Sequence, residues 1–435
     1  MNVEALLSPH KRSLCQSFIR LYRKTTTSDF IHKVAEAFVT RILLIGIGLI
    51  TSVIVARVLG PEGRGLYAVA ATIVAIGVQF GNLGLHASNT YSVARNPQLL
   101  SGLVSNSIFV SFVVGGVSSV LVGVILSLQP EWVQIQGLLL LLSLISIPFG
   151  LAYLLLQNLL VGINDIHSYN TIELGTRIIS LALVGTMIVL HAITVETLYL
   201  ATVFTIVGGF FWTLRQLKTR LIPFPWPSFS LLKKNLSYGL KAYVAALFAF
   251  FVLRADLLMI QYMLGAEQTG FYAVAVGIAD LLYLLPVIFG TVLFPRLTGM
   301  KTDDDRWVYT RQVAQWIALI MVVVAGLVAF CGAPLIRLLY GRMFIPAVPA
   351  LIWLMPGIIF LSINTILMNY FASIGMPLIT VYSPCAAAFL NIGLNVKLIP
   401  IWGIVGASIA SVAAYGMMLV ASLIYIAKQR AYSHI

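Results

Sequence analysis

The segment LGPEGRGLYAVA occupies residues 59–70, and a close copy of it, LGAEQTGFYAVA, occupies residues 264–275. Eight of the twelve aligned positions are identical. Chance convergence is a poor explanation, because glycine, glutamate and tyrosine are among the repeated residues of an otherwise apolar chain. The identical pairs are Leu59/Leu264, Gly60/Gly265, Glu62/Glu267, Gly65/Gly270, Tyr67/Tyr272, Ala68/Ala273, Val69/Val274 and Ala70/Ala275. The chain therefore contains an internal repeat.

The composition around the two copies is that of a membrane protein. Hydrophobic residues make up 60% of the 435 residues, only 9% are charged, and the mean hydropathy is +0.98. A helix needs about 20 apolar residues to cross a hydrocarbon core, and runs of that length favour helices over barrel strands. Twelve spans are predicted, at 35–58, 66–90, 100–128, 134–160, 168–192, 195–214, 236–262, 270–297, 308–330, 346–372, 378–399 and 402–427.

Basic residues are distributed unevenly between the two sets of connecting segments. With the N-terminus inside, the inside segments carry 19 Lys and Arg, whereas the outside segments carry 5. Short basic loops stay on the cytoplasmic side, so both termini are expected there. The five outside residues are Arg57, Arg64, Arg337, Arg342 and Lys397.

The formal net charge of +13 follows from this topology and does not require nucleic acid as a partner. The basic residues 1–34 lack the cleavage site of a signal peptide and are expected to form a helix on anionic lipid. The cysteines, Cys15, Cys331 and Cys385, form neither a metal-binding pattern nor a disulfide framework. We therefore predict no metal site and no cofactor.

Each copy of the repeat joins the first span of a set of six to the second span of that set. Six spans return the chain to its starting side, so the halves are parallel repeats, an arrangement typical of transporters. The predicted organisation is a basic cytoplasmic segment (1–34), a first six-helix lobe (35–214), a cytoplasmic linker (215–235), a second six-helix lobe (236–427) and a cytoplasmic tail (428–435).

The repeated turn itself predicts packing more than direct contact with a substrate. Gly60 and Gly65, with their counterparts in the second copy, allow tight backbone geometry. Tyr67 and Tyr272 are expected at the membrane–water interface, where both the ring and the hydroxyl are satisfied.

Three tracts resemble a known family: VLGPEGRGLYAVA (58–70), RADLLMIQYMLGAEQTGFYAVA (254–275) and LNVKLIPIWGIVGASIASVAAYG (394–416). They are similar to the polysaccharide and O-antigen repeat-unit flippases of the multidrug/oligosaccharidyl-lipid/polysaccharide (MOP) exporter superfamily. The resemblance covers all twelve predicted spans. It implies an all-α integral membrane protein with about twelve transmembrane helices in two pseudo-symmetric lobes, a V-shaped bundle.

The resemblance also implies a function, a location and partners. The cargo would be an undecaprenyl-diphosphate-linked oligosaccharide, moved across the bacterial inner membrane by alternating access. The sequence leaves the driving force open between H+, Na+ and the membrane potential. A polysaccharide polymerase and chain-length proteins are the expected protein partners. Family members that carry lipid II have two further helices, which are not predicted here.

A diphosphate head group requires a wet, cationic path through the membrane, because isolated charge is costly there. Arg41, Arg177 and Arg254 lie within predicted spans, and Lys241 lies one turn inside another. Guanidinium groups bind phosphate oxygens bidentately and a lysine ammonium pairs with them as a point charge, so all four are candidate substrate-binding residues. The alternatives are that Arg41 and Lys241 extend to the lipid head groups, and that Glu173 neutralises Arg177 on the same helix face.

Arg254 and Asp280 occur at similar depth on helices joined by a short hairpin, so they are expected to pair. Such a pair is either structural or a switch that opens when a proton or the diphosphate arrives. Asp256 is not on the same helix face as Arg254 and is a second candidate for carrying a coupling cation.

Two other classes of protein remain as alternatives. A membrane polymerase or ligase usually needs a long outer loop with catalytic groups, but the longest outer segment, around 331–345, has no acid or histidine. A small-molecule antiporter of the drug-extrusion branch usually carries cationic cargo and favours an acidic cavity. The excess of arginine within the predicted spans argues against it.

Overall fold

The computed structural model describes the backbone of residues 9–433 except 134, 136 and 221–225, and the side chains from residue 39 onward except at those positions and at 238, 241, 242, 432 and 433. Every regular element in this part of the chain is helical. The elements are α1 (Pro9–Asn82), α2 (Leu85–Arg95), η2 (Pro97–Leu99), α3 (Leu100–Leu128), α4 (Gly137–Gly162), α5 (Ile166–Val189), α6 (Val195–Lys218), α7 (Phe229–Leu264), α8 (Ala266–Thr298), α9 (Asp303–Phe330), α10 (Gly332–Leu339), η3 (Arg342–Ala347), α11 (Val348–Ser373) and α12 (Ile379–Ser433).

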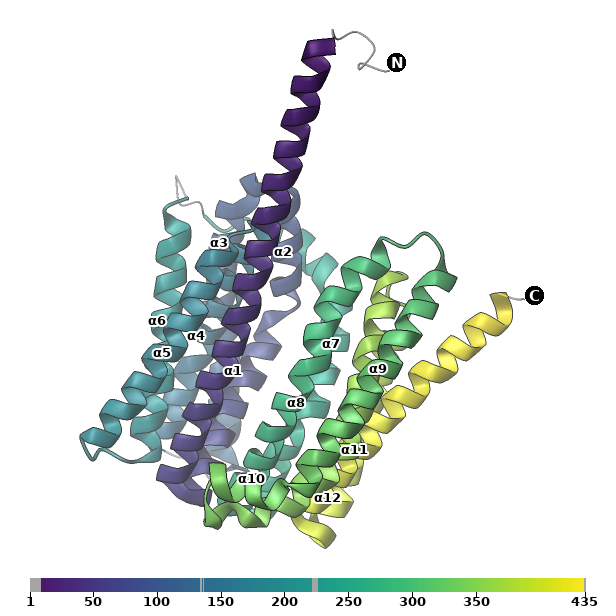
Figure 1. The fold of residues 1–435 in the computed structure, drawn as a ribbon. Helices are drawn as coiled ribbons and strands as arrows, with labels where there is room; N and C mark the ends of the chain where they lie inside the picture. Colours follow the sequence, from purple (N-terminus) through teal and green to yellow (C-terminus); the bar gives the residue numbers. More distant parts are fainter. Residues whose placement is uncertain (1–8, 134, 136, 221–225, 434–435) are drawn as a thin grey trace.

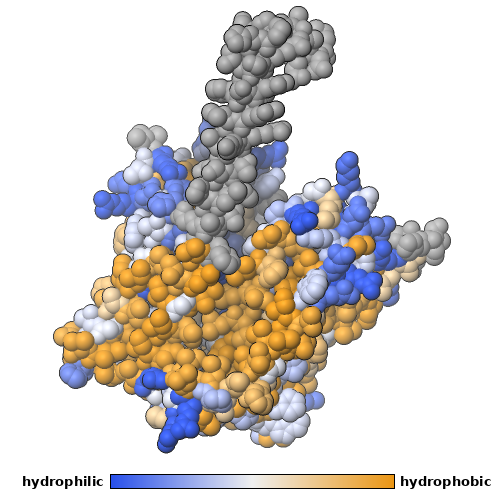
Figure 2. All heavy atoms as spheres, in the orientation of Figure 1, coloured by the Kyte–Doolittle hydropathy of each residue, from blue (hydrophilic) through white to orange (hydrophobic). Residues whose placement is uncertain are grey.

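An apolar belt surrounds the bundle. Ten helices in the described residues are long and apolar enough to cross a membrane. Figure 2 shows hydrophobic side chains in a broad band across the middle of the molecule, with hydrophilic residues gathered above and below it. Exposed apolar side chains are the stable arrangement only against lipid, so the protein is a multi-pass membrane protein.

Two of the ten helices turn back on themselves, which gives the twelve predicted crossings. The α1 helix breaks at Gly60 and α12 breaks at Gly403, both at positive φ. Nη2 of Arg64 lies 3.4 Å from Oγ of Ser52, twelve residues earlier, although a straight helix would separate them by about 18 Å. The chain therefore reverses at Gly60.

The twelve crossings form two lobes, and the expectation of a two-lobed all-α bundle is confirmed. The N-lobe comprises α1–α6 and the C-lobe comprises α7–α12 (Figure 1). Each lobe has a buried apolar cluster of its own, and a larger cluster joins α1 to the C-lobe. We call the end of the bundle with Gly60 and Gly265 the turn end, and the opposite end, where the chain passes from α6 to α7, the linker end. The lobes meet where α1 packs against α8 and α7.

Three predicted boundaries differ in the structure. The predicted span 66–90 is interrupted because Leu83 and Gly84 both have positive φ, and α2 begins after this break. The predicted outer loop 331–345 forms the short helices α10 and η3. The predicted tail 428–435 continues α12 as far as Ser433. The predicted basic segment 1–34 lies outside the residues whose side chains are described.

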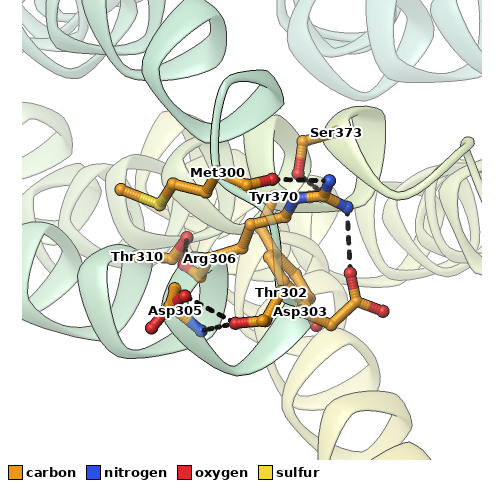
Figure 3. Close-up of polar contacts among 8 residues, drawn as sticks. All are labelled: Met300, Thr302, Asp303, Asp305, Arg306, Thr310, Tyr370 and Ser373. Atoms are coloured by element: carbon orange, nitrogen blue, oxygen red, sulfur yellow. Dashed lines mark hydrogen bonds and ion pairs between the residues drawn. The ribbon is translucent and has the colours of Figure 1, made fainter.

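Side-chain contacts hold the α8–α9 connection at the linker end (Figure 3). Thr302 caps α9 by accepting a 3.1 Å hydrogen bond from the N–H of Asp305. Arg306 pairs with Asp303 at 2.9 Å and donates to the carbonyl of Met300 at 3.0 Å. Carboxylates in the first turn of a helix also interact favourably with its dipole. These contacts give Arg306 a structural role that needs no contact with a substrate.

Candidate functional site

The N-lobe has a cavity of about 380 Å³ between α1, α4, α5 and α6. Its walls combine charged groups with many hydroxyls, and volumes of this order are typical of sites for small ligands or head groups. The lining residues are Gly48, Thr51, Ser52, Val55, Arg64, Tyr67, Tyr153, Glu173, Thr176, Arg177, Ser180, Thr202, Thr205 and Ile206.

Arg64 is the most deeply placed cation of this cavity. It follows the break at Gly60, so its side chain folds back along the preceding half of α1 and donates to Ser52 at 3.4 Å. Its guanidinium carbon lies 5.8 Å from the centre of the Tyr67 ring. Its Nε is buried and has no hydrogen-bond partner among the described residues. A guanidinium in a cavity with an unpartnered Nε is well suited to bind an anion.

Arg177 lies on the α5 wall of the same cavity. The predicted pairing with Glu173 is confirmed, although the separation of 3.9 Å is long and the Arg177 side chain is 55% exposed. Glu173 also accepts a long hydrogen bond, 3.5 Å, from the hydroxyl of Tyr153. Because both contacts are weak, Arg177 remains accessible to another anion. With Arg64, the cavity holds two cations and one carboxylate.

The hydroxyl groups supply neutral hydrogen-bonding positions around these charges. The hydroxyls of Tyr67 and Thr202 lie 2.6 Å apart, between α1 and α6. Tyr153 accepts a 2.8 Å hydrogen bond from the amide of Gln157, which orients its ring. Hydroxyls both donate and accept, so such a wall suits a hydrated, oxygen-rich ligand.

The C-lobe places a carboxylate where the N-lobe has open space. Asp256 on α7 is 2% exposed and accepts hydrogen bonds from the hydroxyls of Tyr272, at 2.5 Å, and Ser411, at 3.4 Å. The adjoining cavity measures only about 10 Å³, enough for one water molecule or one small cation. Its wall also includes Asp280 and Tyr283.

Further side-chain oxygen atoms that could bind a cation lie near Asp256 in the C-lobe core. Asn391 donates to Ser411 at 3.4 Å and accepts from Asn395 at 2.9 Å, and all three are fully buried. Oδ1 of Asn395 has no partner within the described chain. A set of carboxylate, amide and hydroxyl oxygens suits a hard cation or a proton. No group of three His, Cys, Asp or Glu side chains forms a metal cluster in the described residues.

The predicted pairing of Arg254 with Asp280 is confirmed. Nη2 of Arg254 lies 2.8 Å from Oδ2 of Asp280, and the two side chains are 31% and 38% exposed. The bond joins α7 to α8 next to the small C-lobe cavity. Partial exposure leaves this ion pair open to water and to competing ions.

The remaining predicted site residues lie elsewhere. Arg41 is exposed on α1, and the described walls of the two cavities do not include it. The side chain of Lys241 lies outside the described residues. The structure therefore brings Arg177 into the N-lobe cavity and groups Asp256 with Asp280 in the C-lobe.

Two expectations for the repeated turn were wrong. Arg64 was assigned to an outside loop, but its side chain enters the N-lobe cavity because the chain reverses directly before it. Tyr67 and Tyr272 were expected at the membrane surface, but Tyr67 lines that cavity and Tyr272 is 0% exposed against Asp256. The sequence alone could have singled out Arg64, because the second copy of the repeat has an uncharged residue, Thr269, at the equivalent position.

Comparison with known sequences identifies a family. Residues 54–349 match the model of a family described as "Polysaccharide biosynthesis protein". An uncharacterized membrane protein of Methanocaldococcus jannaschii is 26% identical over 202 residues. That match spans 46% of this chain and 40% of the length of the relative.

Solved structures share the fold. An inward-facing multidrug resistance MATE family transporter of the MOP superfamily has a TM-score of 0.73 at 15% identity, with 89% of this chain and 94% of that chain covered. The lipid II flippase MurJ, in an inward closed conformation, has a TM-score of 0.71 at 14% identity, with coverage of 91% and 87%. The chain therefore belongs to the polysaccharide biosynthesis protein family and has the fold of the MOP superfamily.

Proposed function

We propose that this protein is a flippase that moves an undecaprenyl-diphosphate-linked oligosaccharide across a membrane by alternating access. The observation that carries the proposal is Arg64, a cation in an N-lobe cavity of about 380 Å³ whose buried Nε has no partner among the described residues. Arg177 provides a second cation on the α5 wall of the same cavity. Family membership in polysaccharide biosynthesis and the fold shared with a lipid II flippase support the same cargo class.

The cavity chemistry fits the head group of such a lipid better than its glycan. Diphosphate oxygens accept several hydrogen bonds at once, which guanidinium groups donate in a fixed fork. The surrounding hydroxyls suit the remaining oxygens and the first sugar. The rest of the oligosaccharide is too large for this volume and would lie in the space between the lobes, with the lipid tail in the bilayer.

The C-lobe is proposed to couple transport to a cation. Asp256, buried beside a space for one water molecule or small ion, is the candidate carrier of H+ or Na+. The neighbouring pair of Arg254 and Asp280 is the candidate switch, because its opening would change the charge beside the small C-lobe cavity. Alternating access then requires that cation binding and cargo binding favour different lobe arrangements.

The proposed orientation follows the distribution of basic residues. The linker end, which carries most Lys and Arg in the connecting segments, faces the cytoplasm, and the turn end faces outward. The proposed location is the bacterial inner membrane. A polysaccharide polymerase and chain-length proteins would act on the delivered lipid-linked units.

A drug antiporter is the second candidate, since one solved structure with this fold is a multidrug resistance transporter. The two readings make opposite demands on the N-lobe cavity. Two arginines against one glutamate disfavour cationic drugs and favour an anionic head group.

The test uses purified protein in proteoliposomes containing a fluorescent undecaprenyl-diphosphate oligosaccharide, with flipping followed by a quencher added outside. We expect Arg64→Gln to slow flipping at least about tenfold, because loss of hydrogen bonds to a charged group costs about 1.5–3 kcal/mol. Arg64→Lys should restore part of the rate. Arg342→Gln, at an exposed arginine of η3, is the matched control and should flip at the rate of the native protein. Equal rates in Arg64→Gln and Arg342→Gln would refute the cationic head-group site.

A further inference from the structure

The two copies of the repeated turn face each other at the turn end. A Cβ atom at Gly65 would overlap the carbonyl oxygen of Ala266, and a Cβ atom at Gly270 would overlap that of Pro61. Pro61 and Ala266 occupy equivalent positions of the two copies, as do Gly65 and Gly270. The contact is therefore reciprocal: each copy gives a glycine to the other and receives one from it. Backbones this close require glycine on both sides.

The two turns also share one backbone conformation. Gly60 has φ 68° and ψ −176°, and Gly265 has φ 86° and ψ −178°. This region of backbone space is open essentially to glycine alone. The same bend therefore places the helix that follows each turn in the same relation to its partner, which makes the reciprocal contact possible.

An arginine adds a second tie across the same end. Arg57, three residues before the bend, donates from Nε to the carbonyl of Leu339 at 2.6 Å and from Nη2 to that of Leu338. Leu339 is the last residue of α10, so an N-lobe cation caps the C-terminus of a C-lobe helix. Cations at this position satisfy free carbonyls and interact favourably with the helix dipole.

The linker end is joined differently. There the glycine contact is between Gly84, at the α1–α2 break, and Gly239 of α7, which are not equivalent positions of the repeat. Asn235 of α7 donates to Asn89 at 3.0 Å and accepts from Ser92 at 2.9 Å in the same seam. This glycine contact is also mutual, because a Cβ atom at either residue would overlap the carbonyl oxygen of the other, but it joins positions that the repeat does not relate.

From these contacts we propose that the repeated turn is a latch that holds the two lobes together at the turn end, formed by the reciprocal glycine contact and the Arg57 cap on α10. The latch rests on the alternating-access part of the proposed function and not on the identity of the cargo. Arg64 lies between Gly63 and Gly65 of the latch, so a group bound at Arg64 is held by the element that must move when the turn end opens. The repeat supplies the same glycine bend on both sides of this contact.

The experiment measures access to the N-lobe cavity from the turn end. Cys15, Cys331 and Cys385 are replaced by serine, and Thr205→Cys in the cavity wall serves as the reporter. The full-length chain is labelled in spheroplasts with a membrane-impermeant maleimide, with no cargo added. We expect Gly65→Ala and Gly270→Ala each to raise the labelling rate at least about fivefold, because a methyl group separates the two backbones. Arg57→Gln should raise it about twofold to threefold.

Gly277→Ala is the matched control, since it lies on α8 seven residues after Gly270 and a Cβ there meets no described atom within 4 Å. Faster labelling in both latch variants with no change in Gly277→Ala supports the latch. Native rates in the latch variants, or an equal rise in the control, overturn it. If either alanine variant does not reach the membrane, the test rests on Arg57→Gln: a faster labelling rate in this variant supports the latch, and the native rate overturns it. The labelling assay needs no cargo. If the native protein failed to flip the undecaprenyl-diphosphate oligosaccharide but the labelling rates changed as expected for the latch, the proposed cargo would be refuted and the latch would stand.

Discussion

The two lobes share one bend but use it for opposite chemistry. In the N-lobe the repeated tyrosine, Tyr67, borders a cavity of about 380 Å³, whereas in the C-lobe its counterpart, Tyr272, is fully buried beside a space of about 10 Å³. The offset of 205 residues that aligns Leu59 with Leu264 also aligns Thr51 with Asp256. The tyrosine hydroxyl therefore reaches a neutral threonine, Thr202, in one lobe and a carboxylate in the other.

The two lobes also differ in charge at equivalent positions of the repeat. The N-lobe has Arg64 where the C-lobe has Thr269, and the C-lobe has Asp256 where the N-lobe has Thr51. One duplicated frame thus presents an arginine with an unpartnered Nε in one half and a buried carboxylate in the other. The comparison teaches that the two halves share the geometry of the turn but differ at two positions where one has threonine and the other a charged residue, and the proposed anion and cation sites rest on these two differences.

Removing each tyrosine hydroxyl gives the largest expected difference between the lobes. Tyr272→Phe should lower the free energy of unfolding by about 2–3 kcal/mol, because Asp256 stays buried after losing its shortest hydrogen bond. Tyr67→Phe should cost less than about 1 kcal/mol, since the hydroxyl of Thr202 can turn to water in the open cavity. Thermal unfolding in detergent measures both. Equal losses would mean that the two sites do not differ in solvation.

Neutralising the C-lobe ion pair is expected to have an intermediate effect. Asp280→Asn should lower the free energy of unfolding by about 1 kcal/mol, because Arg254 loses its 2.8 Å partner while remaining partly exposed to water. If the pair is also the coupling switch, the same change should make flipping independent of an imposed ion gradient. A gradient dependence that persists in Asp280→Asn would assign the pair a structural role only.

The sequence predicted the fold further than it predicted the site. Apolar run lengths and the repeat were sufficient for twelve crossings in two lobes, because burial in lipid constrains every span independently. Pairing within a hairpin, as for Arg254 and Asp280, followed from depth alone. Arg64 was missed because hydropathy alone places it in a loop. The bend at Gly60, which has a positive φ, turns its side chain into the cavity, and hydropathy carries no information about that bend. The cavity walls come from four helices, and the pattern of residues along any one helix does not show which residues of different helices meet.

The smallest predicted effect concerns the single acid in the N-lobe cavity, Glu173. It lies 3.9 Å from the exposed guanidinium of Arg177, so it competes weakly with any bound anion for that cation. Glu173→Gln should tighten binding of inorganic pyrophosphate about twofold to fivefold, measured by calorimetry on the detergent-solubilised protein at low salt. The gain should shrink as salt is raised, because dissolved ions already screen the repulsion that the substitution removes. Weaker binding in Glu173→Gln would show instead that the acid orients Arg177 for its ligand, and the N-lobe cavity would then contrast less sharply with the carboxylate site of the C-lobe.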